Sequence, residues 1–217
     1  MEVFLNRLKE GYTPTHFKIP ISEKSCIIGL KAAFVAKVNE DFHQYIPVKE
    51  QESKFVDIAV GLVSDMTKWG ILLNGIPGNG KTTTLYAIRK IINALDIKDP
   101  NCVNEERSMG MPIKTAKELC DAFITNKKAY EGYKFSTILG IDELGVEPAT
   151  IQSYGNDYTP LCDILSYRYE RRLFTVITTN IPNSEIRPKY GDRIADRMNE
   201  MFKVISMPDI NFRKKFL

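Results

Sequence analysis

The most informative segment of the chain is Gly75-Ile76-Pro77-Gly78-Asn79-Gly80-Lys81-Thr82, which matches the pattern G-x-x-x-x-G-K-[ST] at every fixed position. In this pattern the glycines let the backbone curl, so that several N–H groups point at phosphate oxygens. The lysine reaches the β- and γ-phosphates, and the threonine hydroxyl binds Mg²⁺. We therefore predict an ATP site. The residues predicted to contact the nucleotide are Gly75, Ile76, Pro77, Gly78, Asn79, Gly80, Lys81, Thr82 and Thr83.

The flanking sequence supports this interpretation over a glycine turn that happens to precede a helix. An apolar run at 71–73 ends directly before the loop, as a buried strand would. Apolar residues then recur at helical spacing over 81–95, so a helix begins at the loop and points its positive end at the phosphates. Strand, loop and helix follow in the order that the site needs.

Two carboxylates follow the apolar run at 138–141, namely Asp142 and Glu143. A phosphate-loop site needs an acidic group on a neighbouring strand for the magnesium shell and a second group that orients the attacking water. We predict that Asp142 and Thr82 hold Mg²⁺, and that Glu143 and Lys81 are catalytic. The alternative is an ordinary strand end with solvated acids. A glutamate directly after the aspartate favours ATP hydrolysis over a nucleotide kinase.

Polar residues farther along the chain are weaker candidates for catalytic roles at the predicted ATP site. Asn180 ends a β-branched run at 173–179 and is predicted to hydrogen-bond the γ-phosphate or the water, the alternative being a cap on a helix near Asn183. Arg193 and Arg197 are four residues apart on one face of a predicted helix. Arginine suits transition-state charge, but spacing alone favours local pairs with Asp196 and Glu200.

The pattern of elements predicts an α/β fold. Helices are expected at 22–41 and after Pro47, and they form a short helical N-terminal extension over residues 1–68. From residue 69 to 217, strands and helices alternate, which predicts a three-layer αβα P-loop NTPase domain with a five-stranded parallel sheet. The strands are expected at 71–73, 112–115, 137–141, 173–179 and 204–207, and the helices at 81–95, 116–124, 158–172 and 190–202.

Bulk properties narrow the class of protein. The chain has 217 residues, 43% of them apolar, a net charge of +3 and four scattered cysteines. These values suit one cytoplasmic domain with reduced thiols, and no apolar run is long enough to span a bilayer. The weak net charge means that any nucleic-acid binding must come from local patches.

Three segments carry a family resemblance. Residues 167–180 (YRYERRLFTVITTN), 141–145 (IDELG) and 190–198 (YGDRIADRM) resemble bacterial helicase loaders of the DnaC/DnaI type and transposition-helper ATPases of the IstB type. The resemblance covers about residues 68–207. It implies an AAA+ core without a helical lid, with Asn180 at the sensor-1 position and Arg193 as an arginine finger. Such a finger acts on a neighbour's γ-phosphate, so the resemblance implies a homo-oligomer when ATP is bound and hydrolysis at subunit interfaces.

The resemblance also implies DNA and either a replicative helicase or a transposase as partners. Two clusters are candidates for single-stranded DNA contacts: Lys127, Lys128, Tyr130 and Lys134, and the tip Arg213-Lys214-Lys215. For both, a solvated face is the alternative. The insert at 146–160 is expected either to form a loop at the central face of a ring or to connect elements.

Two other functions stay open at this point. A small-molecule P-loop kinase would need an acceptor pocket and an arginine-rich lid, and the Asp142-Glu143 pair and Asn180 argue against it. An ATP-gated scaffold with negligible turnover is opposed by Glu143 and Arg193.

Overall fold

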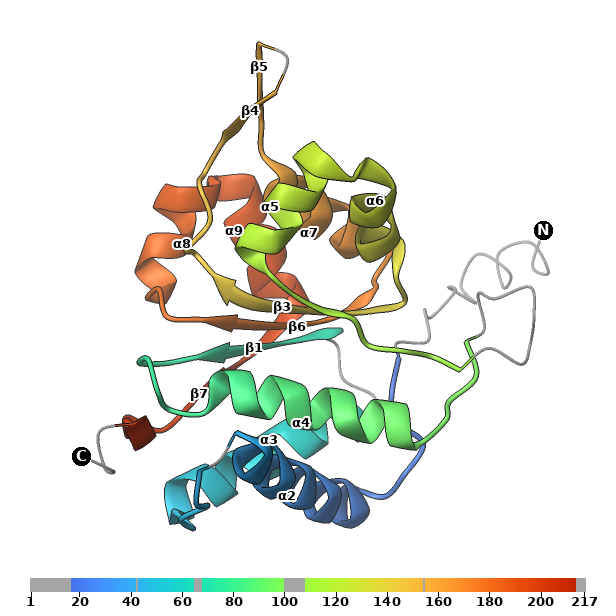
Figure 1. Cartoon of the computed structure of the whole chain (residues 1–217), viewed down its shortest axis with the longest axis vertical. Coiled ribbons are helices and arrows are strands. Elements are labelled where there is room, and N and C mark those ends of the chain that lie inside the picture. Colours follow the sequence, from blue (N-terminus) through green and yellow to red (C-terminus); the bar gives the residue numbers. More distant parts are fainter. Residues whose placement is uncertain (1–16, 42, 65–67, 100–107, 154, 214–217) are drawn as a thin grey trace, which may run out of the picture.

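The computed structural model describes residues 17–41, 43–64, 68–99, 108–153 and 155–213. A five-stranded sheet lies at its centre, with the strand order β2-β3-β6-β1-β7 and parallel pairing throughout (Figure 1). Its strands are β1 (Gly70–Asn74), β2 (Ile113–Thr115), β3 (Ile138–Leu144), β6 (Phe174–Thr179) and β7 (Phe202–Ser206). The predicted five-stranded parallel sheet of a P-loop NTPase is therefore confirmed.

Helices cover both faces of the sheet, as parallel strands require (Figure 1). One face carries α2 (Glu23–Glu40), α3 (Lys49–Val63) and α4 (Lys81–Ala94). The other carries α5 (Ala116–Thr125), α6 (Lys127–Phe135), α7 (Pro160–Glu170), α8 (Asn183–Tyr190) and α9 (Asp192–Met201). Two separate apolar cores result, one on each side of the strands.

The helices before the phosphate loop share a core with the sheet. Leu30 and Phe34 of α2 and Phe55 and Ile58 of α3 are buried in one cluster with Ile71 of β1. Because α2 lies along α4, it also comes close to the phosphate loop at the start of α4. The predicted division into 1–68 and 69–217 remains a prediction, and its residues 1–16 and 65–67 lie outside the described ranges.

The fully buried Arg168 fastens α7 to the sheet. Its guanidinium donates to Thr175 Oγ1 at 2.8 Å, Phe174 O at 2.7 Å and Ser136 O at 2.7 Å. These acceptors belong to β6 and to the turn before β3. A buried charge is tolerated only with such a set of acceptors, so this arginine of the quoted 167–180 segment is structural.

Several elements were not among the predicted ones. Helix α6 was missed, and the helix near Asn183, here α8, had entered only as part of the capping alternative. The insert at 146–160 contains a hairpin of β4 (Ile151–Ser153) and β5 (Asn156–Tyr158) that projects from the domain (Figure 1). Strand β3 runs three residues farther than expected, so Asp142 and Glu143 belong to it. The described residues after β7, 207–213, contain no α-helix. In the described part of the chain, no helix combines the length and apolar character of a membrane span.

Candidate nucleotide-binding site

The loop between β1 and α4 takes a shape that depends on glycine. Gly78 and Gly80 have φ angles of 82° and 87°, in the left-handed region that side chains disfavour. A Cβ on Gly78 would also lie 2.4 Å from Asn211 Oδ1, so the chain after β7 packs directly on the loop. Phe212 N donates to Gly78 O at 2.9 Å and holds that segment in place. Gly80, which is fixed in the motif, and Gly78, which is not, are therefore both required by the shape of the loop.

Lys81 is held inside the loop. Its Nζ donates to Gly75 O at 2.8 Å, Ile76 O at 2.7 Å and Asn79 Oδ1 at 2.9 Å. Asn79 in turn donates to Pro208 O at 3.2 Å, so this loop residue is a buried brace. Burial lowers the pKa of Lys81 to about 8, against the charge of Asp142, which raises it. A polyphosphate bound here would supply the missing negative charge.

Three side chains and one backbone N–H, from three elements, meet at the mouth of the loop. Thr82 Oγ1 donates to Asp142 Oδ1 at 3.1 Å, and Thr178 Oγ1 donates to the same oxygen at 2.5 Å. The backbone N–H of Glu143 donates to Thr178 Oγ1 at 2.9 Å. The adjacent ends of β3 and β6 thus place the predicted magnesium ligands beside the predicted water-orienting residue.

The donor set fits magnesium. A hydroxyl and a carboxylate are hard oxygen ligands, and Mg²⁺ commonly takes one or two protein ligands while it keeps several waters. In the described ranges, no three His, Cys, Asp or Glu side chains gather as a metal cage. Thr82 and Asp142 therefore suit an ion shared with phosphates better than a structural metal.

Glu143 stands at an irregularity of β3. The register with β6 shifts between Ile141 and Leu144, and Glu143 has a φ angle of 57°. A bulge with a positive φ turns a side chain away from the direction that the pleat would give it. Glu143 and Asn180 are both exposed, and both line the cavity at the loop. Asn180 does not cap α8, whose N-cap is Pro182 without a side-chain bond, so the capping alternative is wrong.

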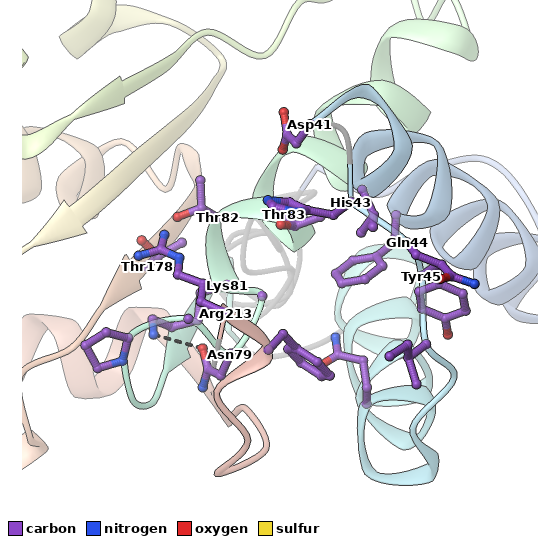
Figure 2. Close-up of a pocket in the computed structure, with 18 of the residues that line it drawn as sticks. Asp41, His43, Gln44, Tyr45, Asn79, Lys81, Thr82, Thr83, Thr178 and Arg213 are labelled. Atoms are coloured by element: carbon purple, nitrogen blue, oxygen red, sulfur yellow. Dashed lines mark hydrogen bonds between the residues drawn. The ribbon is translucent and has the colours of Figure 1, made fainter. Parts of the chain in front are cut away.

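The cavity at the loop has a volume of about 330 Å³. Figure 2 shows Lys81 and Thr82 on one side of it and Gln44 and Tyr45, from the segment between α2 and α3, on the other. No motif marks that segment in the sequence, although it borders the cavity. The cavity residues that were not predicted are Phe34, Val38, Asp41, His43, Gln44, Tyr45, Ile46, Gln51, Thr178 and Phe212.

The two arginines of α9 lie elsewhere. Neither lines the cavity, and the Arg193 side chain is 77% exposed. Arg193 lies 3.9 Å from Glu170 of α7, and Arg197 donates to the same carboxylate at 2.9 Å. The expected local pairs with Asp196 and Glu200 are therefore replaced by one partner on another helix. Arg197 is mostly covered, in keeping with a structural role.

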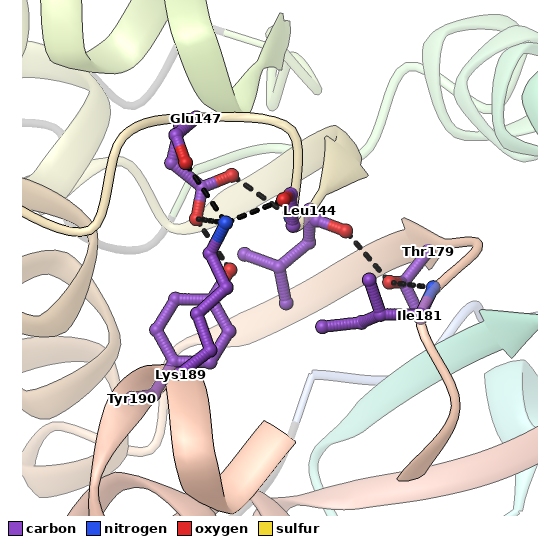
Figure 3. Close-up of polar contacts among 7 residues, drawn as sticks. Leu144, Glu147, Thr179, Ile181, Lys189 and Tyr190 are labelled. Carbon is purple, nitrogen blue, oxygen red and sulfur yellow. Dashed lines mark hydrogen bonds and ion pairs between the residues drawn. The ribbon is translucent and has the colours of Figure 1, made fainter. Parts of the chain in front are cut away.

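A polar network ties the loop after β3 to α8 (Figure 3). The buried Glu147 accepts from the N–H of Gly145 at 2.8 Å and from the Tyr190 hydroxyl. Lys189 Nζ donates to the carbonyl oxygens of Gly145 and Glu147. The insert that begins here is thus anchored at the end of α8, where the chain turns into α9 and Arg193.

The residues of the two predicted DNA-contact clusters lie in different surroundings in the structure. Tyr130 is buried and donates to Asp163 Oδ2 at 2.8 Å, so its ring cannot stack on a base, and that part of the prediction is wrong. Lys134 pairs with the same carboxylate at 2.7 Å. Arg213 lines the nucleotide cavity, and Lys214 and Lys215 lie outside the described residues.

Solved structures share this fold. The DnaC helicase loader superposes with a TM-score of 0.55 at 20% identity, covering 76% of this chain and 94% of its own. DnaI superposes with a TM-score of 0.54 at 20% identity, and the match covers 76% of this chain and 88% of DnaI. AMPPCP-bound DnaA from Aquifex aeolicus superposes with a TM-score of 0.54 at 14% identity, and the match covers 79% of this chain and 51% of DnaA. The chain has the αβα P-loop NTPase fold of these proteins. By sequence, no protein-family model and no curated protein matches it. The resemblance to helicase loaders thus holds in the fold, at low sequence identity.

Proposed function

We propose that the chain is an Mg²⁺-dependent ATPase that assembles when ATP is bound and serves DNA replication as a helicase loader. The observation that carries the proposal is a cavity of about 330 Å³ lined by Lys81, Thr82 and Glu143, with Asp142 hydrogen-bonded to Thr82. The same cavity also has the apolar and aromatic side chains that a nucleoside base needs.

Each residue of the site has its own role in binding or hydrolysis. The backbone N–H groups of residues 75–82 and the Lys81 ammonium bind the phosphates, and Thr82 and Asp142 hold the magnesium. When bound, Mg²⁺ neutralises charge on the phosphate oxygens. Glu143 takes a proton from the attacking water, and Asn180 orients that water or the γ-phosphate. Phosphoryl transfer needs little more than such positioning and charge.

Arg193 would act on a neighbouring subunit. It lies outside its own cavity and is 77% exposed, so it cannot serve its own ATP without a large movement. If a second copy of the chain docks its nucleotide site against α9, the guanidinium of Arg193 would enter the site of that second copy. The γ-phosphate then links two subunits while it is present, and its hydrolysis releases them.

The partner is inferred from the fold neighbours. A helicase loader and a replication initiator bound to single-stranded DNA are among them, which supports a role in DNA replication with a replicative helicase and single-stranded DNA as partners. An IstB-like transposition helper is the alternative. Glu143→Gln protein, immobilised with ATP, should retain a replicative helicase, and Lys81→Ala protein should not. Retention of a transposase instead would favour the alternative.

ATP hydrolysis measured with and without single-stranded DNA, over a range of protein concentrations, tests the assembly. We expect the rate to rise more than linearly with protein and to increase with DNA. A rate strictly proportional to protein and indifferent to DNA would contradict an assembling machine. A rate that appears only with a small phosphate acceptor would instead support a kinase.

A further inference from the structure

Gln51 is the least explained polar residue in the described structure. It lies in the first turn of α3, its side chain is 1% exposed, and it lines the nucleotide cavity. Among the described residues, neither Oε1 nor Nε2 has a hydrogen-bond partner. An unpaired buried amide lowers the stability of the fold, so a ligand that pairs with it would recover free energy.

The surroundings of Gln51 are those of a base pocket. A Cβ on Gly80 would lie 4.0 Å from Gln51 Oε1 and 3.2 Å from the Phe34 ring, so the amide and the ring both border the phosphate loop. Phe34 packs edge-on against Phe55 and Tyr45, with ring centroids 5.4 Å and 6.0 Å away. One carboxamide among aromatic walls is the arrangement that orients a flat, mostly apolar ligand.

We propose that the Gln51 carboxamide reads the edge of the base and selects adenine nucleotides; this rests on the proposed ATP site. A carboxamide offers an acceptor oxygen beside an NH₂ donor. Adenine offers the complement, its 6-amino donor beside a ring-nitrogen acceptor, and the two form a bidentate pair. On its N7 edge guanine presents two acceptors, which would leave Gln51 Oε1 unpaired. A base without the 6-amino group likewise lacks the donor that would pair with Gln51 Oε1.

The sharpest test compares ATP with purine riboside triphosphate, which lacks the 6-amino group. Wild-type protein should bind ATP about tenfold more tightly than this analogue, and GTP should also bind more weakly. Gln51→Leu should bind ATP and the analogue equally. Gln152→Leu, the same change at an exposed position of β4, should keep the wild-type preference.

Thermal unfolding without nucleotide separates base reading from a structural role. Because Gln51→Leu replaces two unpaired polar atoms by apolar ones, its Tm should equal or exceed that of the wild type. A large fall in Tm would show that Gln51 supports the fold and would overturn the proposal.

The binding results also separate the two hypotheses. If the wild type binds ATP, and Gln51→Leu leaves the preference for ATP over the analogue unchanged, base reading by Gln51 is wrong and the ATP site stands. If neither wild-type nor Gln51→Leu protein binds any triphosphate, the ATP site itself is wrong and the inference falls with it.

Discussion

The hydroxyl of Thr82 donates a hydrogen bond of 3.1 Å to Oδ1 of Asp142. This bond joins the first turn of α4 to the end of β3, across 60 residues of chain. Nothing in the local sequence of either residue requires the contact. It exists because β1 and β3 flank β6 in the sheet, so that the carboxyl ends of all three strands open on one edge.

We expect Thr82→Val to lose most of the magnesium dependence of nucleotide binding, because valine keeps the shape and lacks the ligand oxygen. The gain in ATP affinity on adding Mg²⁺ should fall by about tenfold or more. Thr82→Ser, which keeps the hydroxyl, should stay near the wild type. Titrations with Mg²⁺ and with EDTA measure this gain, and an unchanged gain in Thr82→Val would remove Thr82 from the magnesium shell.

The pKa of Lys81 predicts how ATP affinity depends on pH. Burial lowers this pKa from 10.5 to about 8, so the charged form is disfavoured in the folded protein, and Lys81 loses its proton as the pH rises through about 8. Phosphates favour the charged form and raise the pKa again, so binding above pH 8 must take up a proton. Affinity should be level below pH 8 and fall by up to about tenfold per unit above it.

Calorimetry in two buffers with different ionisation enthalpies measures this proton uptake directly. At pH 9 the binding enthalpy should differ between the buffers, and at pH 7 it should differ much less. Equal affinity and no proton uptake at pH 9 would show that the ammonium of Lys81 does not meet the phosphates.

Arg168 should matter for stability rather than for chemistry. Arg168→Leu leaves the acceptors Phe174 O, Ser136 O and Thr175 Oγ1 buried without their donor. The free energy of unfolding should fall by about 3 kcal/mol or more. Urea denaturation measures the loss, and Arg171→Leu, an exposed neighbour, provides the control with less than about 1 kcal/mol. A small effect at Arg168 would mean that water or other donors replace it.

Arg193→Ala should fold normally, because the side chain is exposed and its ion pair with Glu170 is long, at 3.9 Å. It should bind ATP like the wild type and turn it over at least a hundredfold more slowly, since arginine fingers contribute that much or more. Mixed with Lys81→Ala protein, it should recover part of the activity, because each variant supplies what the other lacks. No recovery at any mixing ratio would argue against a finger that acts between subunits.

The sequence predicted the parts of the site whose signal is local. The phosphate loop, the carboxylates of β3 and Asn180 each follow an apolar run, and hydrophobic burial places such runs in the sheet. Thr178 was not predicted, because its contact with Asp142 depends on the register of β3 and β6 and on the bulge between them. The cavity wall at residues 43–46 was missed for a similar reason, since these residues carry no motif and come near the loop through the packing of α2 on α4.

Helices α6 and α8 have weak local signals. Helix α6 is short, contains a glycine and has one buried residue, Tyr130, and α8 contains Pro188, which normally argues against a helix. The cap of α6 was visible in principle, since Asn126 accepts from the N–H of Ala129 at 3.0 Å, a common use of asparagine at a helix start.

The central claim is that this site hydrolyses ATP with Glu143 activating the water, and one comparison tests it most directly. Glu143→Gln and wild-type protein are each titrated with ATP and Mg²⁺ and then followed for phosphate release. For Glu143→Gln, ATP affinity should stay within about threefold of the wild type and phosphate release should be at least a hundredfold slower, because the glutamine amide keeps the shape of the glutamate and cannot take the proton. Phosphate release by Glu143→Gln at the wild-type rate would contradict the claim.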